Sequence, residues 1–107
     1  MSDPSTAEVI ARSLALAGVR QVFAYPGETI VDLLDRCRIE EIEVVLARRE
    51  ATAAFMAEGL SMATGGVGAC LSTLGPGSTA LANGVASATL DRVPVIALSG
   101  QVDRGRE

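Results

Sequence analysis

Short apolar segments alternate four times with longer amphipathic segments along this chain, and that alternation constrains its fold more than any other feature. The short segments have the length and the Val and Leu content of buried strands, whereas the longer ones repeat apolar residues at helical spacing. Strands that alternate with helices form parallel sheets, because each helix carries the chain back to the same edge. We therefore predict an α/β fold, with an open parallel sheet and helices on both faces.

The boundaries of the predicted elements follow from glycine and proline breaks and from helix-capping residues. The segment 93–98 is continuously apolar, which predicts a strand buried on both faces. Too few residues follow it for another covering helix, so we expect residues 1–107 to be a partial domain, truncated after its fourth strand. The predicted helices are 6–17, 28–37, 50–63 and 78–90, and the predicted strands are 19–24, 44–47, 67–73 and 93–98.

Composition excludes several classes of function. The net charge of −4, without a basic cluster, argues against a nucleic-acid partner. No apolar run approaches the roughly 20 residues of a membrane-spanning helix. The chain has no His, and Cys37 and Cys70 lack metal-ligand spacing, so we predict no metal site within it. Cys70 lies in a predicted strand and is expected to be buried, and unpaired cysteines fit a reducing cytoplasm.

Each predicted strand ends in a motif that could contribute to a ligand site. The carboxyl ends of parallel strands meet at one edge of a sheet, which is where open α/β sheets bind ligands. Four otherwise ordinary motifs therefore converge on the same edge. In chain order they are Tyr25-Pro26-Gly27, Glu50, Thr73 with Gly75-Pro76-Gly77, and Gln101.

Simpler interpretations exist for the two strongest of these motifs. Glu50 alone could be an acid at a helix start, which stabilises the helix dipole by about 0.3–1 kcal/mol. The segment 75–80 formally matches the dinucleotide-binding pattern G-x-G-x-x-G/A. That pattern recurs by chance, and Pro76 removes one backbone donor from the turn, which argues against a nucleotide module.

Taken in order, the motifs resemble the N-terminal pyrimidine-binding domain of thiamine-diphosphate-dependent enzymes. The most similar branch is that of acetolactate synthase (acetohydroxyacid synthase), and the superfamily also contains 2-oxo-acid decarboxylases and oxidases. The resemblance extends over nearly the whole chain. The segments that carry it are YPG at 25–27, RREATAAFMAEG at 48–59, TLGPG at 73–77 and DRVPVIALSGQ at 91–101.

This resemblance implies roles for individual residues. The family glutamate that matches Glu50 hydrogen-bonds a ring nitrogen of the cofactor aminopyrimidine. The bond favours the imino tautomer, whose nitrogen removes a proton from the thiazolium carbon. Gln101 matches a glutamine that reaches the substrate, which makes Glu50 and Gln101 the expected catalytic residues. The expected cofactor-binding residues are Tyr25, Pro26, Gly27, Glu50, Thr73, Pro76 and Gly77.

The resemblance also implies what this chain needs from elsewhere. Family members bind the diphosphate and Mg²⁺ through a separate C-terminal domain with a Gly-Asp-Gly motif, and this sequence lacks that motif. The active site forms between two subunits, so the resemblance implies a homo-oligomer, a dimer or a tetramer. The implied substrate is a 2-oxo acid such as pyruvate, and FAD binding depends largely on a middle domain. Alternatives are an inactive remnant or interaction module, and another 2-oxo-acid decarboxylase of the superfamily.

Overall fold

The computed structural model describes residues 2–105, which form a parallel four-stranded sheet flanked by helices. Across the sheet the strands run in the order β2-β1-β3-β4, so β1 and β3 are central. Every strand pair is parallel, which confirms the predicted α/β class. In chain order the elements are α1 (Thr6–Leu16), β1 (Gln21–Ala24), η1 (Glu28–Ile30), α2 (Val31–Ile39), β2 (Glu43–Leu46), α3 (Glu50–Thr64), β3 (Gly68–Ser72), α4 (Pro76–Asp91) and β4 (Val95–Ser99).

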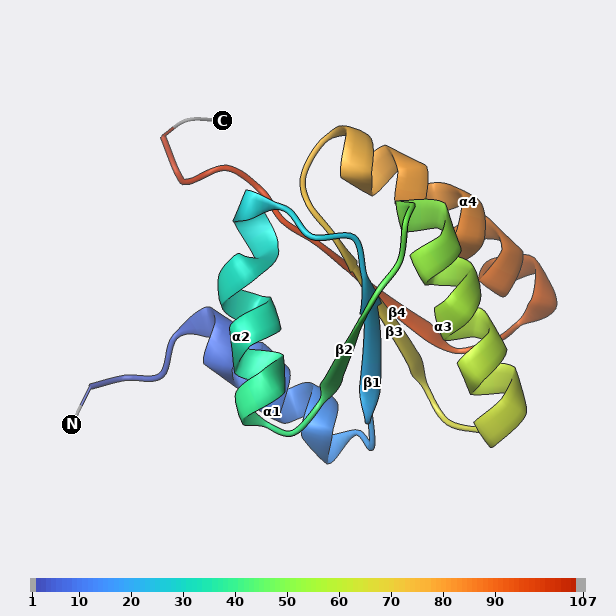
Figure 1. Cartoon of the computed structure of the whole chain (residues 1–107), viewed down its shortest axis with the longest axis horizontal. Coiled ribbons are helices and arrows are strands. Elements are labelled where there is room, and N and C mark those ends of the chain that lie inside the picture. The colour runs from blue at the N-terminus through green and yellow to red at the C-terminus, as the bar shows by residue number, and fades with distance from the viewer. Residues whose placement is uncertain (1, 106–107) are drawn as a thin grey trace.

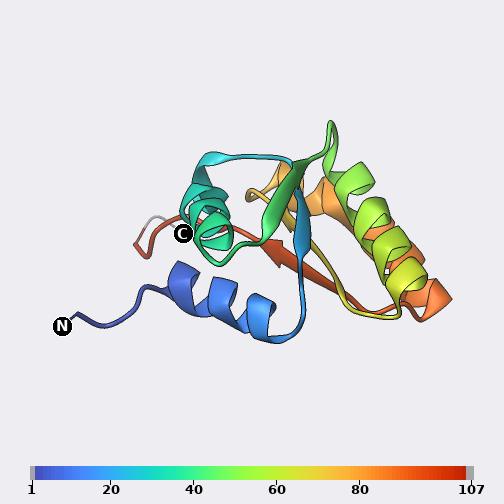
Figure 2. The same cartoon turned by 60° about the horizontal axis from the view of Figure 1, so that its bottom comes forward.

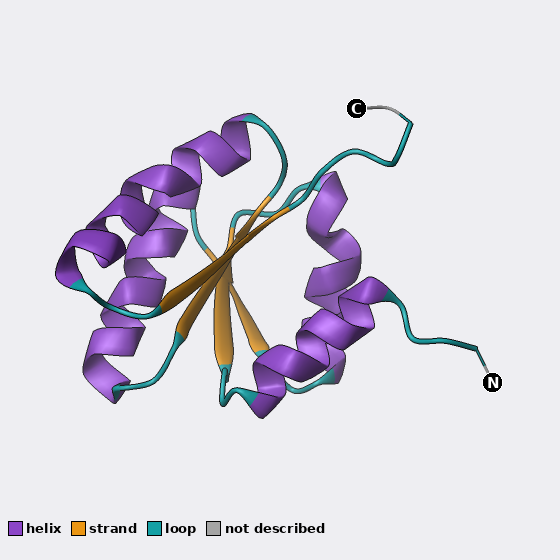
Figure 3. Ribbon diagram, turned by 180° about the vertical axis from the view of Figure 1, so that it is seen from behind, coloured by secondary structure: helices purple, strands orange, loops and turns teal. Residues whose placement is uncertain are grey.

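Helices cover both faces of the sheet, as predicted. Helices α1 and α2 lie on one side and α3 and α4 on the other (Figures 1 and 3). Strand side chains alternate accordingly, because successive residues of a strand point to opposite faces. Val22 and Ala24 belong to the core beneath α1 and α2, whereas Phe23 and Cys70 belong to the core beneath α3 and α4.

The core beneath α3 and α4 is built from small residues, which brings these two helices close together. They lie side by side along one face of the sheet (Figure 2). Gly84 of α4 packs directly on α3: a Cβ at this position would overlap the Cβ of Ala54 and lie 2.9 Å from the backbone nitrogen of Phe55. Cys70 of the central strand is fully buried, as predicted, and burial raises the pKa of its thiol to about 11.

The prediction that the last strand is buried on both faces was wrong. Within residues 2–105, strand β4 lies at an edge of the sheet and pairs only with β3. Ala97 and Ser99 are exposed, and Val95 is only partly buried. The fully buried strand is β3, which lies between β1 and β4. The segment 93–98 has the apolar composition of a buried strand, but it lies at the edge of this sheet.

Two helices begin differently from prediction. The segment expected as one helix from residue 28 starts with the short 3-10 helix η1 before α2. Helix α4 begins at Pro76, two residues earlier than predicted, because proline fits the first turn of a helix, where its missing N–H costs nothing. Gly75 precedes it with φ of 61°, a conformation that glycine adopts without strain. No helix within residues 2–105 has both the length and the apolar character needed to cross a membrane.

Candidate functional site

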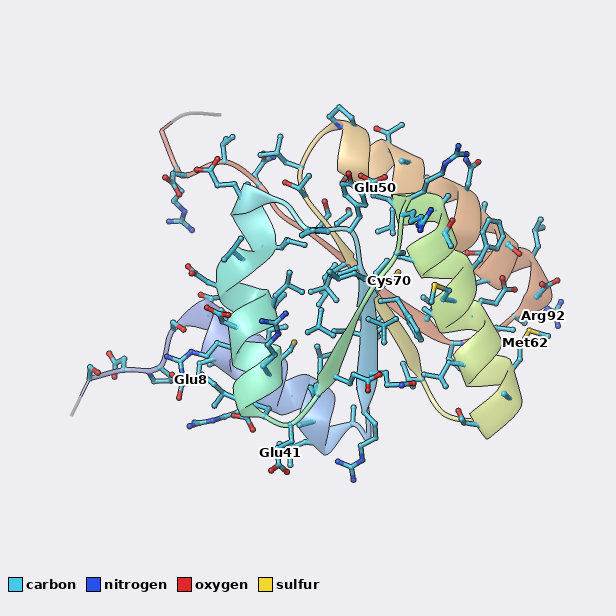
Figure 4. The ribbon with its side chains drawn as sticks, viewed as in Figure 1. Glu8, Glu41, Glu50, Met62, Cys70 and Arg92 are labelled. Carbon is cyan, nitrogen blue, oxygen red and sulfur yellow. The ribbon has the colours of Figure 1, made fainter. Side chains whose placement is uncertain are left out.

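The carboxyl ends of the four strands lie along one edge of the sheet, and Glu50 is the charged side chain placed there by α3. It is the first residue of α3 and is partly buried. Figure 4 shows it at the end of α3 that adjoins the first turn of α4, at the opposite end of the helix from Met62. A carboxylate at this position interacts favourably with the helix dipole, so the fold tolerates the charge.

Gly77 of α4 lies beside the Glu50 carboxylate. Gly77 is buried, and a Cβ built on it would lie 3.5 Å from Oε1 of Glu50. The same Cβ would lie 3.0 Å from Cγ2 of Thr73. The absence of a side chain at residue 77 therefore leaves only a narrow gap, no larger than the missing methyl group, between Thr73 and Glu50. Three predicted site residues, which follow two different strands, meet here.

Thr73 also contacts the loop that follows the first strand. A Cβ at Gly27 would overlap the Thr73 side chain and lie 2.8 Å from its Oγ1. Gly27 therefore has to be glycine for its loop to approach Thr73 this closely. Thr73 is thus the centre of the site, in contact with Gly27 on one side and Gly77 on the other.

Two further hydroxyl groups reach Thr73, and neither residue was predicted as a site residue. Thr29 Oγ1 and Thr73 Oγ1 are 2.8 Å apart and share a hydrogen bond. Ser99 donates to the backbone carbonyl of Thr73 at 3.1 Å, and its hydroxyl also pairs with that of Ser78. The position of Ser99 at a strand end could have identified it. Thr29 gave no such signal, because its segment was expected to be an ordinary helix.

Four predicted site residues do not take part in the contacts around Thr73. Tyr25, Pro26 and Pro76 are exposed. Gln101 is also exposed and lines a different, open cavity of about 360 Å³ from which Glu50 is absent. The described residues therefore join Gly27, Glu50, Thr73 and Gly77, and leave Gln101 apart. The cavity is lined by Glu28, Thr29, Asp32, Leu74, Gln101, Val102 and Asp103.

The charge around Glu50 leaves its carboxylate available to a ligand. Arg48 and Arg49 precede it directly, but both are exposed. The ion pairs among residues 2–105 all involve Arg12 or Arg36, so none engages Glu50. The site thus presents a partly buried hydrogen-bond acceptor beside a glycine-lined gap. Chemically, this carboxylate can accept a hydrogen bond from an N–H group of a ligand at the sheet edge.

The sequence model for the family described as thiamine pyrophosphate enzyme, N-terminal TPP binding domain, matches residues 4–107. The chain belongs to this family. The resemblance predicted from the sequence motifs is therefore confirmed. Thiamine pyrophosphate (TPP) is another name for thiamine diphosphate. This TPP-binding domain carries Glu50, Thr73 and Gly77 at the edge of its sheet, where the family resemblance implies cofactor contacts.

Relatives of this TPP-binding domain are acetolactate synthase large subunits from distant organisms. The isozyme 3 large subunit of Escherichia coli is 48% identical over 99 residues, which cover 92% of this chain and 17% of the relative. Chloroplastic acetolactate synthase 2 of Nicotiana tabacum is 45% identical over 100 residues, or 91% and 15% of the two chains. A probable large subunit from Methanocaldococcus jannaschii is 43% identical over 96 residues, or 90% and 16%. The chain spans about a sixth of each relative.

Proposed function

We propose that this chain supplies the pyrimidine-binding part of a thiamine-diphosphate-dependent 2-oxo-acid enzyme of the acetolactate synthase type. The observation that carries the proposal is the position of the Glu50 carboxylate, which lies at the sheet edge facing Gly77 without an ion-pair partner among residues 2–105. A glutamate that only stabilised its helix would not need a glycine opposite it. Family membership supports thiamine diphosphate as the ligand.

The residues present fit an aminopyrimidine ring. Glu50 would hydrogen-bond a ring nitrogen and hold the shared proton at its carboxylate, and the partly buried position limits competition from water. The absence of a side chain at Gly77 would let the ring edge approach Glu50 without a clash at this position. Tyr25, Pro26, Gly27 and Pro76 would line the approach. The cofactor, when bound, supplies the electron sink for decarboxylation of the substrate.

Other parts of the enzyme are proposed from the relatives. Residues 1–107 would be a partial pyrimidine-binding domain, with Mg²⁺ and the diphosphate held by a diphosphate-binding domain of the same or another chain. The assembly would be a homo-oligomer, a dimer or a tetramer, in the cytoplasm. Gln101 would reach a 2-oxo-acid substrate of the pyruvate type, and the reaction would join its product to a second 2-oxo acid. FAD would depend on a further domain.

Calorimetry tests this proposal. The chain is titrated with thiamine diphosphate and Mg²⁺ alone, and again in the presence of the diphosphate-binding domain of an acetolactate synthase. We expect binding only in the second titration, and we expect Glu50→Gln to weaken it. Glu41→Gln is the matched control, because Glu41 is exposed and lies at the opposite end of the sheet (Figure 4). Absence of binding in both titrations would indicate an inactive remnant or an interaction module instead.

A further inference from the structure

We propose that Thr29 is a positioning residue, whose hydroxyl fixes Thr73 and thereby the gap between Gly77 and Glu50. The inference rests on the proposed function, because that gap adjoins the proposed pyrimidine site. It adds a residue outside the sequence motifs that carry the family resemblance. Thr29 does not contact Glu50; it acts through Thr73.

The geometry of Thr29 supports a specific role for its hydroxyl. The hydrogen bond to Thr73 is short, at 2.8 Å, and is partly buried. It joins η1, which follows the first strand, to the loop after β3. On its other side Thr29 packs against Gly100, where a Cβ would overlap the Thr29 side chain. Thr29 is therefore held between the loops that follow β3 and β4.

Thr73 transmits this restraint to the site. Its side chain contacts the positions of Gly27 and Gly77, and Gly77 in turn faces Glu50 Oε1. The backbone of Thr73 is held separately, because its carbonyl accepts a hydrogen bond from Ser99. Only the Thr73 side chain therefore depends on Thr29. A change in its rotamer would move Cγ2 relative to Gly77 and alter the width of the gap.

Thr29 also borders open space, although its side chain packs against Gly100. It lines two separate cavities: the polar one of about 360 Å³ that contains Gln101, and an apolar one of about 270 Å³ bounded by Ile30 and Leu98. Because these cavities adjoin Thr29, the contact with Gly100 leaves part of the residue unpacked. The hydrogen bond to Thr73 adds a directional restraint on the Thr29 side chain, and its loss would leave room for the segment to shift.

The test compares Thr29→Val, which keeps the shape and removes the hydroxyl, with Thr29→Ser, which keeps the hydroxyl. Thr89→Val is the matched control, because it removes a threonine hydroxyl that bonds only within α4, to the carbonyl of Val85. A hydrogen bond worth roughly 1 kcal/mol corresponds to about a fivefold effect. We expect Thr29→Val to weaken thiamine diphosphate binding about fivefold in the complex with the diphosphate-binding domain. Thr29→Ser and Thr89→Val are expected to bind like the wild type.

A double-mutant cycle separates positioning from a general loss of structure. If Thr29 acts through Thr73, then Thr29→Val and Thr73→Val combined weaken binding no more than Thr73→Val alone. Fully additive effects would overturn the proposal, as would wild-type binding by Thr29→Val.

A second readout needs no cofactor. The amides of Gly77 and Gly100 are hydrogen-bonded to Leu74 and Ser72 in the loops around Thr73. We expect Thr29→Val, but not Thr29→Ser, to speed their hydrogen exchange about fivefold in the free chain. Unchanged exchange would overturn the positioning role. Faster exchange together with no cofactor binding by the wild type would retain that role and overturn only the proposed function.

Discussion

The carboxylate of Glu50 and the backbone of Gly77 face each other so closely that a Cβ on Gly77 would lie 3.5 Å from Oε1. Glu50 follows β2 at one edge of the sheet, whereas Gly77 follows the central strand β3. Helices α3 and α4 pack on the same face, and this packing brings their first residues together. The relationship explains why an acid and a glycine-rich turn, unremarkable separately, form one site.

Gly77→Ala is expected to damage the site while changing the fold little. Gly77 has an ordinary negative φ, so the backbone accepts alanine. The new methyl would lie 3.0 Å from Thr73 Cγ2 and fill the gap beside Glu50. We expect thiamine diphosphate binding to weaken about tenfold or more, measured by calorimetry with the diphosphate-binding domain. Gly59→Ala, in an exposed part of α3 with nothing within 4 Å of the added methyl, is the control. Equal affinities for the two variants would contradict this account of the gap.

Gly84→Ala and Gly59→Ala are expected to change stability in opposite directions. At Gly84 the methyl would overlap the Cβ of Ala54, so α3 and α4 must separate, and overpacking of this kind costs about 1–3 kcal/mol. At Gly59 the methyl is free, and alanine favours a helix over glycine by about 0.5–1 kcal/mol. Urea denaturation of each variant measures the change in the free energy of unfolding. A stabilising Gly84→Ala would show that the helices do not pack this closely.

Glu58 predicts a pH dependence of stability. Its side chain is only 5% exposed, Ser87 donates to Oε2, and Oε1 has no hydrogen-bond partner. The nearby carboxyl group of Asp91, together with burial, raises the pKa of Glu58 above its ordinary value of 4.5, although Ser87 opposes the shift. The folded state then holds a proton that the unfolded state releases. Stability is therefore expected to fall as the pH rises from about 4.5 through the raised pKa.

Glu58→Gln tests that dependence, because glutamine keeps the shape of the side chain but does not titrate. We expect the fall in the free energy of unfolding as the pH rises above 4.5 to become shallower in this variant. Glu41→Gln, at an exposed position, is expected to retain the wild-type slope. If the free energy of unfolding of Glu58→Gln depends on pH as steeply as that of the wild type, a group other than Glu58 causes the dependence.

Sequence patterns were sufficient for the parallel sheet, the helices on both faces and the edge where the motifs meet, because periodicity and strand-end position are local properties. They also placed Glu50 at the first residue of α3, where the structure has it. Sequence patterns did not predict the position of β4 in the sheet, because apolar content does not distinguish a central strand from an edge strand. Sequence patterns also could not predict the proposed role of Thr29, because its hydrogen bond to Thr73 joins residues that are 44 positions apart.

The most direct test of the central claim measures proton exchange at the thiazolium carbon of thiamine diphosphate bound to this chain together with the diphosphate-binding domain. The wild type, Glu50→Gln and the control Glu41→Gln are compared by NMR after transfer to deuterated water. If Glu50 activates the aminopyrimidine, Glu50→Gln slows exchange on the order of 100-fold or more at saturating cofactor, and Glu41→Gln does not. Exchange at the wild-type rate in saturated Glu50→Gln would contradict the role assigned to this carboxylate.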